Sequence, residues 1–261
     1  MQILNLLEGN CQMKTSISRN KNNKLVRVLV VLFWLLIWQI SSYNLSNKLL
    51  LVSPITVIIT LISLMQTKLF YISIANTFIR IISGFLIGCL TGTLLSIISY
   101  KYIIIKELLR PLISVIKATP VASIIILTLV WIKTANLSVF IGFLMVLPPI
   151  YTNMLKGLDY TDAKMLEMTK VFKVSKYKQI KYIYIPSIKP YLIAAISVAL
   201  GFCWKAGVAA EIIGLPSNTV GEALYKSKIY LNTPELFAWT LFVIITSMVF
   251  ETVFISLIRR I

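Results

Sequence analysis

The stretch Glu167–Pro186 reads EMTKVFKVSKYKQIKYIYIP and separates two long apolar parts of the chain. Glu167 is its single acidic residue, whereas lysine recurs throughout the stretch and beyond both of its ends. In membrane proteins, loops rich in Lys and Arg stay on the cytoplasmic side. The sequence therefore predicts a cytoplasmic loop that carries eight lysines: Lys156, Lys164, Lys170, Lys173, Lys176, Lys178, Lys181 and Lys189.

Two short helices are expected in this loop, which we call the basic loop and place at about 157–186. Ser175 can cap the second helix, which should end near Ile185 because Pro186 disfavours a helical conformation in the residue before it. Two short amphipathic helices on a cytoplasmic loop predict a docking surface for another protein. The first helix has one apolar stripe at helical spacing, formed by Met165, Met168, Thr169 and Phe172.

The composition of the chain places it in a membrane. Its 261 residues are 58% hydrophobic and 13% charged, with a mean hydropathy of +0.86, and ordinary soluble domains are more polar than this. The net charge of +17 comes from 26 basic and 9 acidic residues. Because the basic residues flank apolar stretches rather than forming one stripe, membrane orientation explains the excess better than nucleic-acid binding does.

Residues suited to catalysis or metal binding are scarce. The chain has no histidine, the commonest general base. Its three cysteines, Cys11, Cys89 and Cys203, are scattered and predict neither a disulfide framework nor a zinc site. The GxxxxGK[ST] phosphate loop is also absent. We therefore predict no catalytic residue, metal or cofactor, and expect ATP to be hydrolysed by a separate subunit.

Six stretches are apolar and long enough to cross a membrane, since a hydrocarbon core of roughly 30 Å needs about 20 helical residues. They predict an all-α polytopic protein. The expected spans are 25–43, 71–99, 109–131, 136–156, 186–210 and 235–258.

The sequence also predicts the structure of the segments outside these spans. Residues 1–24 should form a loose cytoplasmic tail, and not a signal peptide, because the apolar run that follows starts too late and is too long. The stretch 49–67 should be a helix at the outer interface, and 211–234 an outer loop with one short helix. Residues 25–261 as a whole are expected to form a single transmembrane domain.

The distribution of charge supports this topology. With the N-terminus inside, the cytoplasmic segments carry 18 Lys and Arg residues, whereas the outer segments carry five. This bias follows the positive-inside rule, and it places the N-terminus and the basic loop in the cytoplasm.

The basic loop resembles the signature loop of the permease subunits of ATP-binding-cassette importers. That signature reads Glu-Ala-Ala, three residues, Gly, nine residues and Ile-x-Leu-Pro. Here Glu167 begins the first triplet, Lys173 occupies the Gly position, and Ile183 begins a closing quartet that ends at Pro186 with the same spacing. Gly permits a left-handed turn that a side chain makes costlier by about 1 kcal/mol. The chain departs from the signature at Met168, Thr169, Lys173 and Ile185.

Other parts of the chain are similar to successive blocks of the nitrate/sulfonate/taurine-type permease subfamily. They are LLVSPITV (50–57), NTFIRIISGFLIGCLTG (76–92), LLRPLISVIKATPVASIIILTLVWI (108–132) and GFCWKAGVAAEIIG (201–214). The resemblance covers roughly 50–258 and implies a type I importer permease in the bacterial cell membrane.

What the resemblance implies is transport without catalysis in this subunit. Two permease subunits, usually identical, would form the pore in the lipid bilayer, and ATPase subunits would dock on the basic loops. An extracytoplasmic binding protein would deliver a small anionic organic solute. The ATPase-coupling residues would be Met165, Glu167, Met168, Thr169, Phe172, Lys173, Ile183 and Pro186.

Small residues recur at every fourth position of the second expected span, at Gly84, Gly88 and Gly92, followed by Ser96. This spacing lets a neighbouring helix approach closely, within the chain or across a dimer.

Three cations, Arg80, Lys117 and Lys205, lie inside the expected spans, where a charge is costly and marks a functional candidate. Two roles stay open. Ion pairs could join Lys117 to Glu251 and Lys205 to Glu211, which lie at similar depths. Alternatively, Arg80, Lys117, Lys205 and Glu211 could line the pathway of an anionic solute.

Other functions also fit a polytopic chain. A secondary transporter would show an internal repeat with broken helices in matching halves, and no such self-similarity is found. A membrane scaffold without transport activity would not need the signature spacing. A solvated basic loop could bind anionic lipid alone, but the spacing favours docking.

Overall fold

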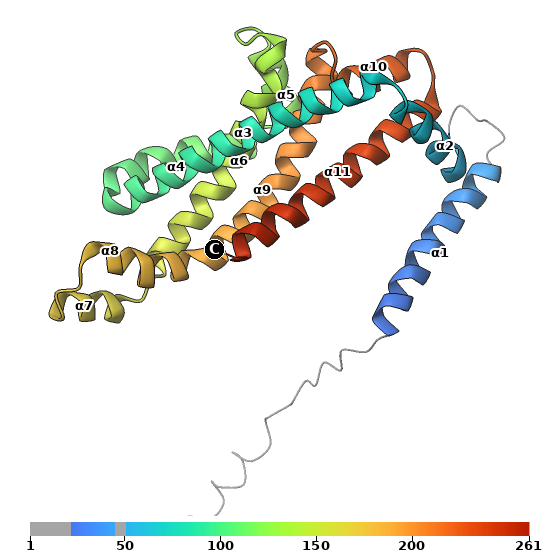
Figure 1. Cartoon of the computed structure of the whole chain (residues 1–261). Helices are drawn as coiled ribbons and strands as arrows, with labels where there is room; N and C mark the ends of the chain where they lie inside the picture. The colour runs from blue at the N-terminus through green and yellow to red at the C-terminus, as the bar shows by residue number, and fades with distance from the viewer. Residues whose placement is uncertain (1–21, 45–50, 261) are drawn as a thin grey trace, which may run out of the picture. The chain divides into compact units, whose positions relative to one another are not determined.

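The structure is a computed structural model that describes residues 22–44 and 51–260, and every regular element in these ranges is a helix (Figure 1). This confirms the predicted all-α class. One compact unit ends at Pro54 and a second begins at Ile55. The elements are α1 (Asn22–Asn44), α2 (Pro54–Met65), α3 (Lys68–Lys101), α4 (Ile103–Ala118), α5 (Val121–Thr128), α6 (Thr134–Asp159), α7 (Ala163–Val171), α8 (Lys176–Gln179), the π-helical turn η2 (Ile180–Tyr184), α9 (Ile185–Gly214), α10 (Val220–Ile229) and α11 (Thr233–Arg260).

Four helical stretches of the described chain are each long and apolar enough to cross a membrane. They are α3, α6, the continuous stretch Lys176–Gly214 and α11, and they contain the spans expected at 71–99, 136–156, 186–210 and 235–258. The apolar helix α1 covers the first expected span. Helices α2 and α10 lie where short helices were expected outside the spans. Most of the expected N-terminal tail, residues 1–21, lies outside the described residues, and the expectation of a single domain from residue 25 stays a prediction.

The expected span 109–131 is not one straight helix. Helices α4 and α5 meet at a bend of 102°. Thr119, between them, has an extended ψ of 131°, because the ring of Pro120 disfavours the helical conformation of the residue before it. Residues 109–131 are therefore a broken span or a re-entrant pair.

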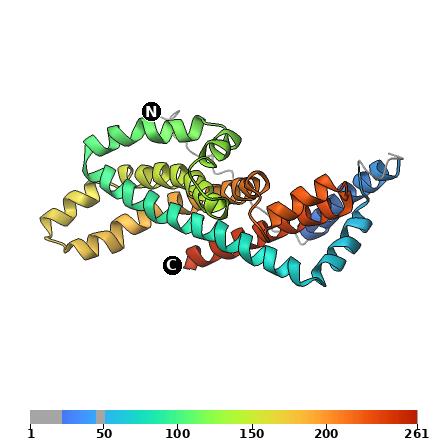
Figure 2. The ribbon, with the colours of Figure 1, turned by 90° about the horizontal axis from the view of Figure 1, so that it is seen from above.

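Helix α6 packs along both α3 and α9 and lies between α3 and the α4–α5 pair (Figure 2). The repeated small residues of α3 face α6. A Cβ atom on Gly84 would lie 2.5 Å from the Val139 carbonyl oxygen, and one on Gly88 would lie 2.7 Å from the Val146 side chain. At Gly92 the corresponding distance to Ile150 is 3.0 Å. These glycines bring the two backbones closer than any side chain would allow.

Helix α11 meets α3 through aromatic rings. Phe70 and Trp239 form a tilted pair with 5.0 Å between ring centroids. Two edge-to-face pairs follow along the helices, Phe78 with Phe250 at 5.5 Å and Phe85 with Phe254 at 5.1 Å. Edge-to-face pairs at this separation are favourable beyond the apolar area that they bury. Helix α3 thus packs against α6 through small residues and against α11 through large aromatic rings.

The second helix of the basic loop does not end near Ile185. The chain stays helical from Lys176 to Gly214, and the Ile185 N–H donates to the Ile180 carbonyl, five residues back. Pro186 falls at the start of α9, where the missing N–H of proline costs little because the π-helical turn has already shifted the hydrogen-bond register. The expected helix end is therefore a π-turn that joins α8 to α9.

Candidate functional site

The first helix of the basic loop has a defined beginning and end. Asp162 caps α7, because its Oδ1 accepts a hydrogen bond of 2.9 Å from the Lys164 N–H. At the other end the Val174 N–H donates to the Thr169 carbonyl at 2.9 Å and the Lys173 N–H donates to the Lys170 carbonyl at 3.2 Å. This pair of bonds is a Schellman motif with Lys173 at its left-handed position, where φ is 48°.

The apolar stripe of α7 is mostly exposed. The exposed fraction is 50% for Met165, 50% for Met168 and 73% for Phe172, whereas that of Thr169 is 3%. Thr169 is the inward end of the stripe, and its hydroxyl donates to the Leu166 carbonyl. Val171, which the stripe omits, is 77% exposed. Four apolar side chains are therefore exposed together at this short helix, which is unusual for a soluble surface.

Contacts between the neighbouring helices fix the two ends of the basic loop. A Cβ atom on Gly157 would lie 3.2 Å from the Ile188 Cα, so the end of α6 touches the beginning of α9. Tyr160 and Tyr191 stack across the same junction with their planes 2° apart. An ion pair of 2.9 Å joins Lys106 to Asp159 and ties α4 to the end of α6. The loop therefore begins and ends where α6 and α9 touch.

The remaining signature positions divide between surface and interior. Glu167 is exposed beside the apolar side chains of α7, and Pro186 is exposed at the start of α9. Ile183, in the π-turn, is buried. Ser175 precedes α8 as expected, but its hydroxyl makes no capping bond. The basic loop thus offers apolar side chains and one carboxylate, surrounded by lysines.

No salt bridge joins the cations of the spans to a carboxylate among the described residues, although the charge of Arg80 acts on the Glu211 carboxyl group. Arg80 is half-buried, and its Nη1 has no hydrogen-bond partner in the described chain. Lys117 and Lys205 are exposed along their helices, and no ion pair to either is found within the described residues. Glu251 instead accepts a hydrogen bond of 2.6 Å from the Ser197 hydroxyl. The expected pairs Lys117–Glu251 and Lys205–Glu211 do not form.

Glu211 is fully buried and holds the beginning of α10. Its Oε2 accepts a hydrogen bond of 2.7 Å from the Thr77 hydroxyl and another of 3.2 Å from the Gly221 N–H. The Thr77 oxygen in turn accepts from the Val220 N–H at 3.0 Å. The first backbone N–H groups of a helix lack internal partners and favour a negative group nearby. We call this arrangement of Thr77, Glu211, Val220 and Gly221 the α10 clasp.

Two features of the clasp escaped the sequence interpretation. Gly221 permits it, because a Cβ atom there would lie 2.6 Å from the Glu211 carbonyl carbon and 2.7 Å from the Ile212 nitrogen. Thr219 begins α10 and accepts from the Glu222 N–H at 3.2 Å. The pattern Thr219-x-x-Glu222 is a capping-box spacing that could have located this helix end.

The charge of Glu222 is stabilised beside the clasp. Burial alone would raise the pKa of Glu222, but its hydrogen bond with Lys226 and the bond from the Asn218 N–H outweigh this and lower the pKa below its ordinary value. Elsewhere in the part of the chain that the structure describes, no three His, Cys, Asp or Glu side chains gather to hold a metal ion.

Comparison with known proteins gives a consistent picture. Residues 84–261 match the family model described as "Binding-protein-dependent transport system inner membrane component". The chain is 24% identical over 204 residues to a putative aliphatic sulfonates transport permease of Bacillus subtilis, covering 77% of this chain and 74% of the relative. It is 30% identical over 135 residues to a nitrate import permease of Synechococcus elongatus, covering 51% of this chain and 48% of that protein. A bicarbonate transport permease of the same species is 25% identical over 146 residues, with 56% and 52% covered.

Proposed function

Since the chain belongs to the family of binding-protein-dependent transport system inner-membrane components, we propose that it forms the translocation pathway of an ATP-binding-cassette importer for a small anion. It would act as a multi-pass subunit of a bacterial cell membrane, paired with a second permease subunit that is usually identical. ATP would be hydrolysed on separate ATPase subunits, and an extracytoplasmic binding protein would deliver the solute.

The exposed apolar side chains of α7 carry the proposal of ATPase docking. Met165, Met168 and Phe172 stand out from a helix whose two ends are capped, and an apolar group of this kind fills a groove in a partner. Glu167 lies beside them as a polar contact at the rim. Because the loop begins and ends where α6 touches α9, motion of a docked ATPase would pass directly into two spans.

Two observations support an anion as the solute. The relatives are named for sulfonates, nitrate and bicarbonate, all of which are anions. Within the spans, the cations Lys117 and Lys205 have no ion-pair partner among the described residues, whereas the charge of Arg80 acts on the Glu211 carboxyl group. Cations that are not neutralised within the chain lower the cost of bringing an anion into a membrane pathway.

Reconstitution tests the whole proposal. The chain would be placed in proteoliposomes with its cognate ATPase, and hydrolysis would be measured with the binding protein either empty or loaded with nitrate, a sulfonate or bicarbonate. We expect hydrolysis only with the ATPase present, and stimulation only by the loaded binding protein. Uptake driven by an ion gradient without ATP would instead support a secondary transporter, and no uptake at all would support a scaffold.

Orientation needs its own experiment, because the docking proposal requires the basic loop in the cytoplasm. Lys178→Cys in the loop and Leu231→Cys after α10 would be made in a chain that lacks Cys11, Cys89 and Cys203. An impermeant thiol reagent should label position 231 in intact cells and position 178 only after the cells are opened. The reverse pattern would overturn the orientation and the docking proposal together.

A further inference from the structure

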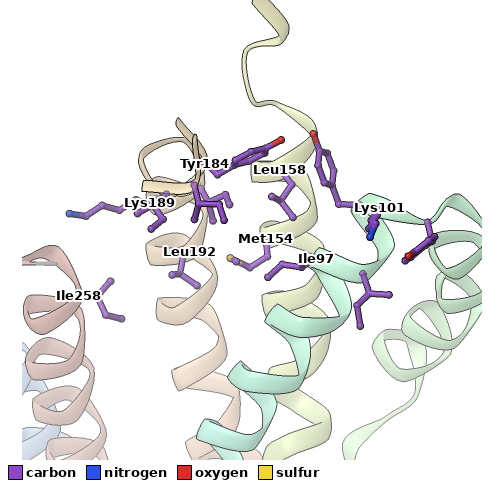
Figure 3. Close-up of a pocket in the computed structure, with 14 residues that line it drawn as sticks. Ile97, Lys101, Met154, Leu158, Tyr184, Lys189, Leu192 and Ile258 are labelled. Atoms are coloured by element: carbon purple, nitrogen blue, oxygen red, sulfur yellow. The ribbon is translucent and has the colours of Figure 1, made fainter. Parts of the chain in front are cut away.

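A cavity lies among the ends of four long helices, next to the basic loop. It has a volume of about 850 Å³, within the range of roughly 300–1,000 Å³ that is usual for ligand sites. The side chains that line it include Ile97 of α3, Met154 of α6, Leu192 of α9 and Ile258 of α11 (Figure 3). Ile180 of the π-turn lines it as well. Four spans and the turn that joins the basic loop to α9 thus surround one space.

The wall of this cavity is almost entirely apolar. Since hardly any polar atom faces the cavity, its two lysines, Lys101 and Lys189, contribute mainly their methylene stems. The Lys101 Nζ lies 5.1 Å from the centroid of the Tyr102 ring, and Figure 3 shows the Lys189 Nζ pointing away from Leu192. Within the described residues, none of the buried polar atoms that lack a hydrogen-bond partner belongs to the wall. A polar ligand would find little to bond here, whereas apolar cavities in proteins take up apolar molecules.

The cavity lies at the depth of one membrane leaflet. Ile97, Leu158 and Ile258 each belong to the last two turns of a span, in α3, α6 and α11. These ends lie on the side of the basic loop, which the predicted topology places in the cytoplasm. Beside them the Tyr100 and Tyr184 rings meet edge to face at 6.2 Å, and tyrosine is enriched where the hydrocarbon of a membrane meets its headgroups. Phospholipid tails of the inner leaflet are therefore the apolar molecules within reach of the cavity.

We propose that the cavity holds an acyl chain of an inner-leaflet phospholipid, whose headgroup stays outside. The chain would pack against the aliphatic side chains of the four spans and against Ile180 and Ile185, the two residues that the hydrogen bond of the π-turn joins. A tail that enters from the bilayer exchanges one hydrocarbon environment for another, so van der Waals contacts and not transfer out of water would hold it. The site should therefore be indifferent to the charge of the headgroup.

The test uses the purified full chain in nanodiscs that contain a phospholipid with a photoreactive diazirine in one acyl chain. After irradiation, mass spectrometry of peptides locates the cross-links. Met154 is the reporter, because it lines the cavity and only 5% of its surface is exposed, so lipid that merely surrounds the spans barely reaches it. We expect cross-linking at Met154, to the same extent for phosphatidylcholine and phosphatidylglycerol probes that carry the same acyl chains.

Two variants fill the cavity from different helices. Leu192→Trp and Ile258→Phe should each reduce cross-linking at Met154 roughly fivefold or more, because the added volume overpacks a cavity that also holds the tail. The second variant serves if the first does not fold. The matched controls are Val198→Trp in α9 and Val253→Phe in α11, which are exposed and do not line the cavity, and they should leave cross-linking at Met154 unchanged.

Three results would overturn the site. They are no cross-linking at Met154 in the wild type, unchanged cross-linking in the filled variants, or a preference for phosphatidylglycerol, which would mean that a headgroup is recognised. A disulfide-linked dimer of Leu192→Cys, made in a chain without its three native cysteines, would also do so, since side chains of a second copy would then fill the cavity. Because this test needs neither ATPase nor solute, its outcome is independent of the reconstitution that tests the proposed function.

Discussion

The α10 clasp buries a carboxyl group, whereas the surface of α7 exposes a phenylalanine. Glu211 has no exposed surface, yet Phe172 is 73% exposed. Figure 1 shows the two helices at opposite ends of α6 and α9. Buried charged residues and exposed large apolar ones are the two departures from ordinary burial that carry information about a protein. In this chain the buried carboxyl group lies at one end of α6 and α9, and the exposed phenylalanine lies at the other end.

The difference shows at which end the unusual residue finds partners within the chain, although Glu211 Oε1 is buried without a hydrogen-bond partner. At the clasp, hydrogen bonds from Thr77 and Gly221 meet Oε2 of the buried carboxyl group, so part of the cost of burial is recovered internally. At α7 the backbone is fully capped, but the apolar side chains have nothing to cover them in the chain that the structure describes. A change in the clasp should therefore affect stability, and a change on α7 should affect assembly.

The largest expected effect is at Phe172. Phe172→Asp should abolish transport and co-purification of the ATPase, because a carboxylate placed in an apolar groove costs several kcal/mol unless it is paired. Membrane insertion and thermal stability of the permease should be unchanged, since Phe172 is exposed. Uptake in proteoliposomes and pull-down of the ATPase measure both outcomes.

Lys176→Ala and Lys178→Ala are the controls for Phe172→Asp. Both lysines are exposed in the second helix of the basic loop, and exposed charges contribute under about 1 kcal/mol each. Both variants should bind the ATPase and transport normally. Normal transport by Phe172→Asp would show that α7 is not the coupling surface and that the loop serves lipid binding instead.

Gly221→Ala should destabilise the α10 clasp. The added Cβ would meet the Glu211 Cβ and backbone, which cannot move aside as a flexible side chain can. We expect a loss of about 3 kcal/mol in the free energy of unfolding, the upper range for overpacking. Thermal unfolding in detergent measures it. Gly201→Ala, where a Cβ has open space, is the matched control, and equal stability of the two variants would contradict a tight clasp.

Thr77→Val tests the hydrogen bonds of the clasp without changing its volume. The variant leaves the Val220 N–H without its acceptor and removes one donor to Glu211. An unsatisfied buried group costs about 1–3 kcal/mol, so the melting temperature should fall. Thr77→Ser keeps the hydroxyl and should recover most of the loss. If Thr77→Ser melts no higher than Thr77→Val, the hydrogen bonds of the hydroxyl do not account for the stability of the clasp.

The sequence predicted the parts of this fold that depend on local pattern. Apolar length located the long helices, and the spacing of Gly84, Gly88 and Gly92 indicated a close helix contact. What it missed depends on distant contacts or on the path of the backbone. The 102° bend between α4 and α5 was missed because the span 109–131 was predicted from its apolar length and not from the effect of Pro120 on the backbone. Pro186 predicted a helix end near Ile185, but the chain stays helical there through a π-turn.

In the candidate site, too, the sequence predicted features that follow local pattern and missed those that depend on distant contacts. The signature spacing located the α7 surface, but burial of Thr169 could not be read from a helical stripe. Pairing of Glu211 with Lys205 was inferred from depth along the chain. In the structure its partners are Thr77 and Gly221, and Thr77 lies 134 residues away in sequence. Such partners follow from packing between helices and not from any local pattern.

The smallest expected effect is at Lys173, and it concerns the turn that ends α7. Lys173 holds φ at 48° in the turn that ends α7, a conformation in which glycine avoids a cost of about 1 kcal/mol. Lys173→Gly should therefore stabilise the turn by up to about 1 kcal/mol, although the freedom that glycine gains in the unfolded chain offsets part of this gain. Hydrogen exchange of the Val174 amide, whose bond to the Thr169 carbonyl closes the turn, measures the local effect. Lys170→Gly, within the helical part of α7, should have the opposite sign, because glycine weakens a helix interior. Faster exchange in Lys173→Gly would show that the lysine side chain contributes to the turn more than its backbone conformation costs.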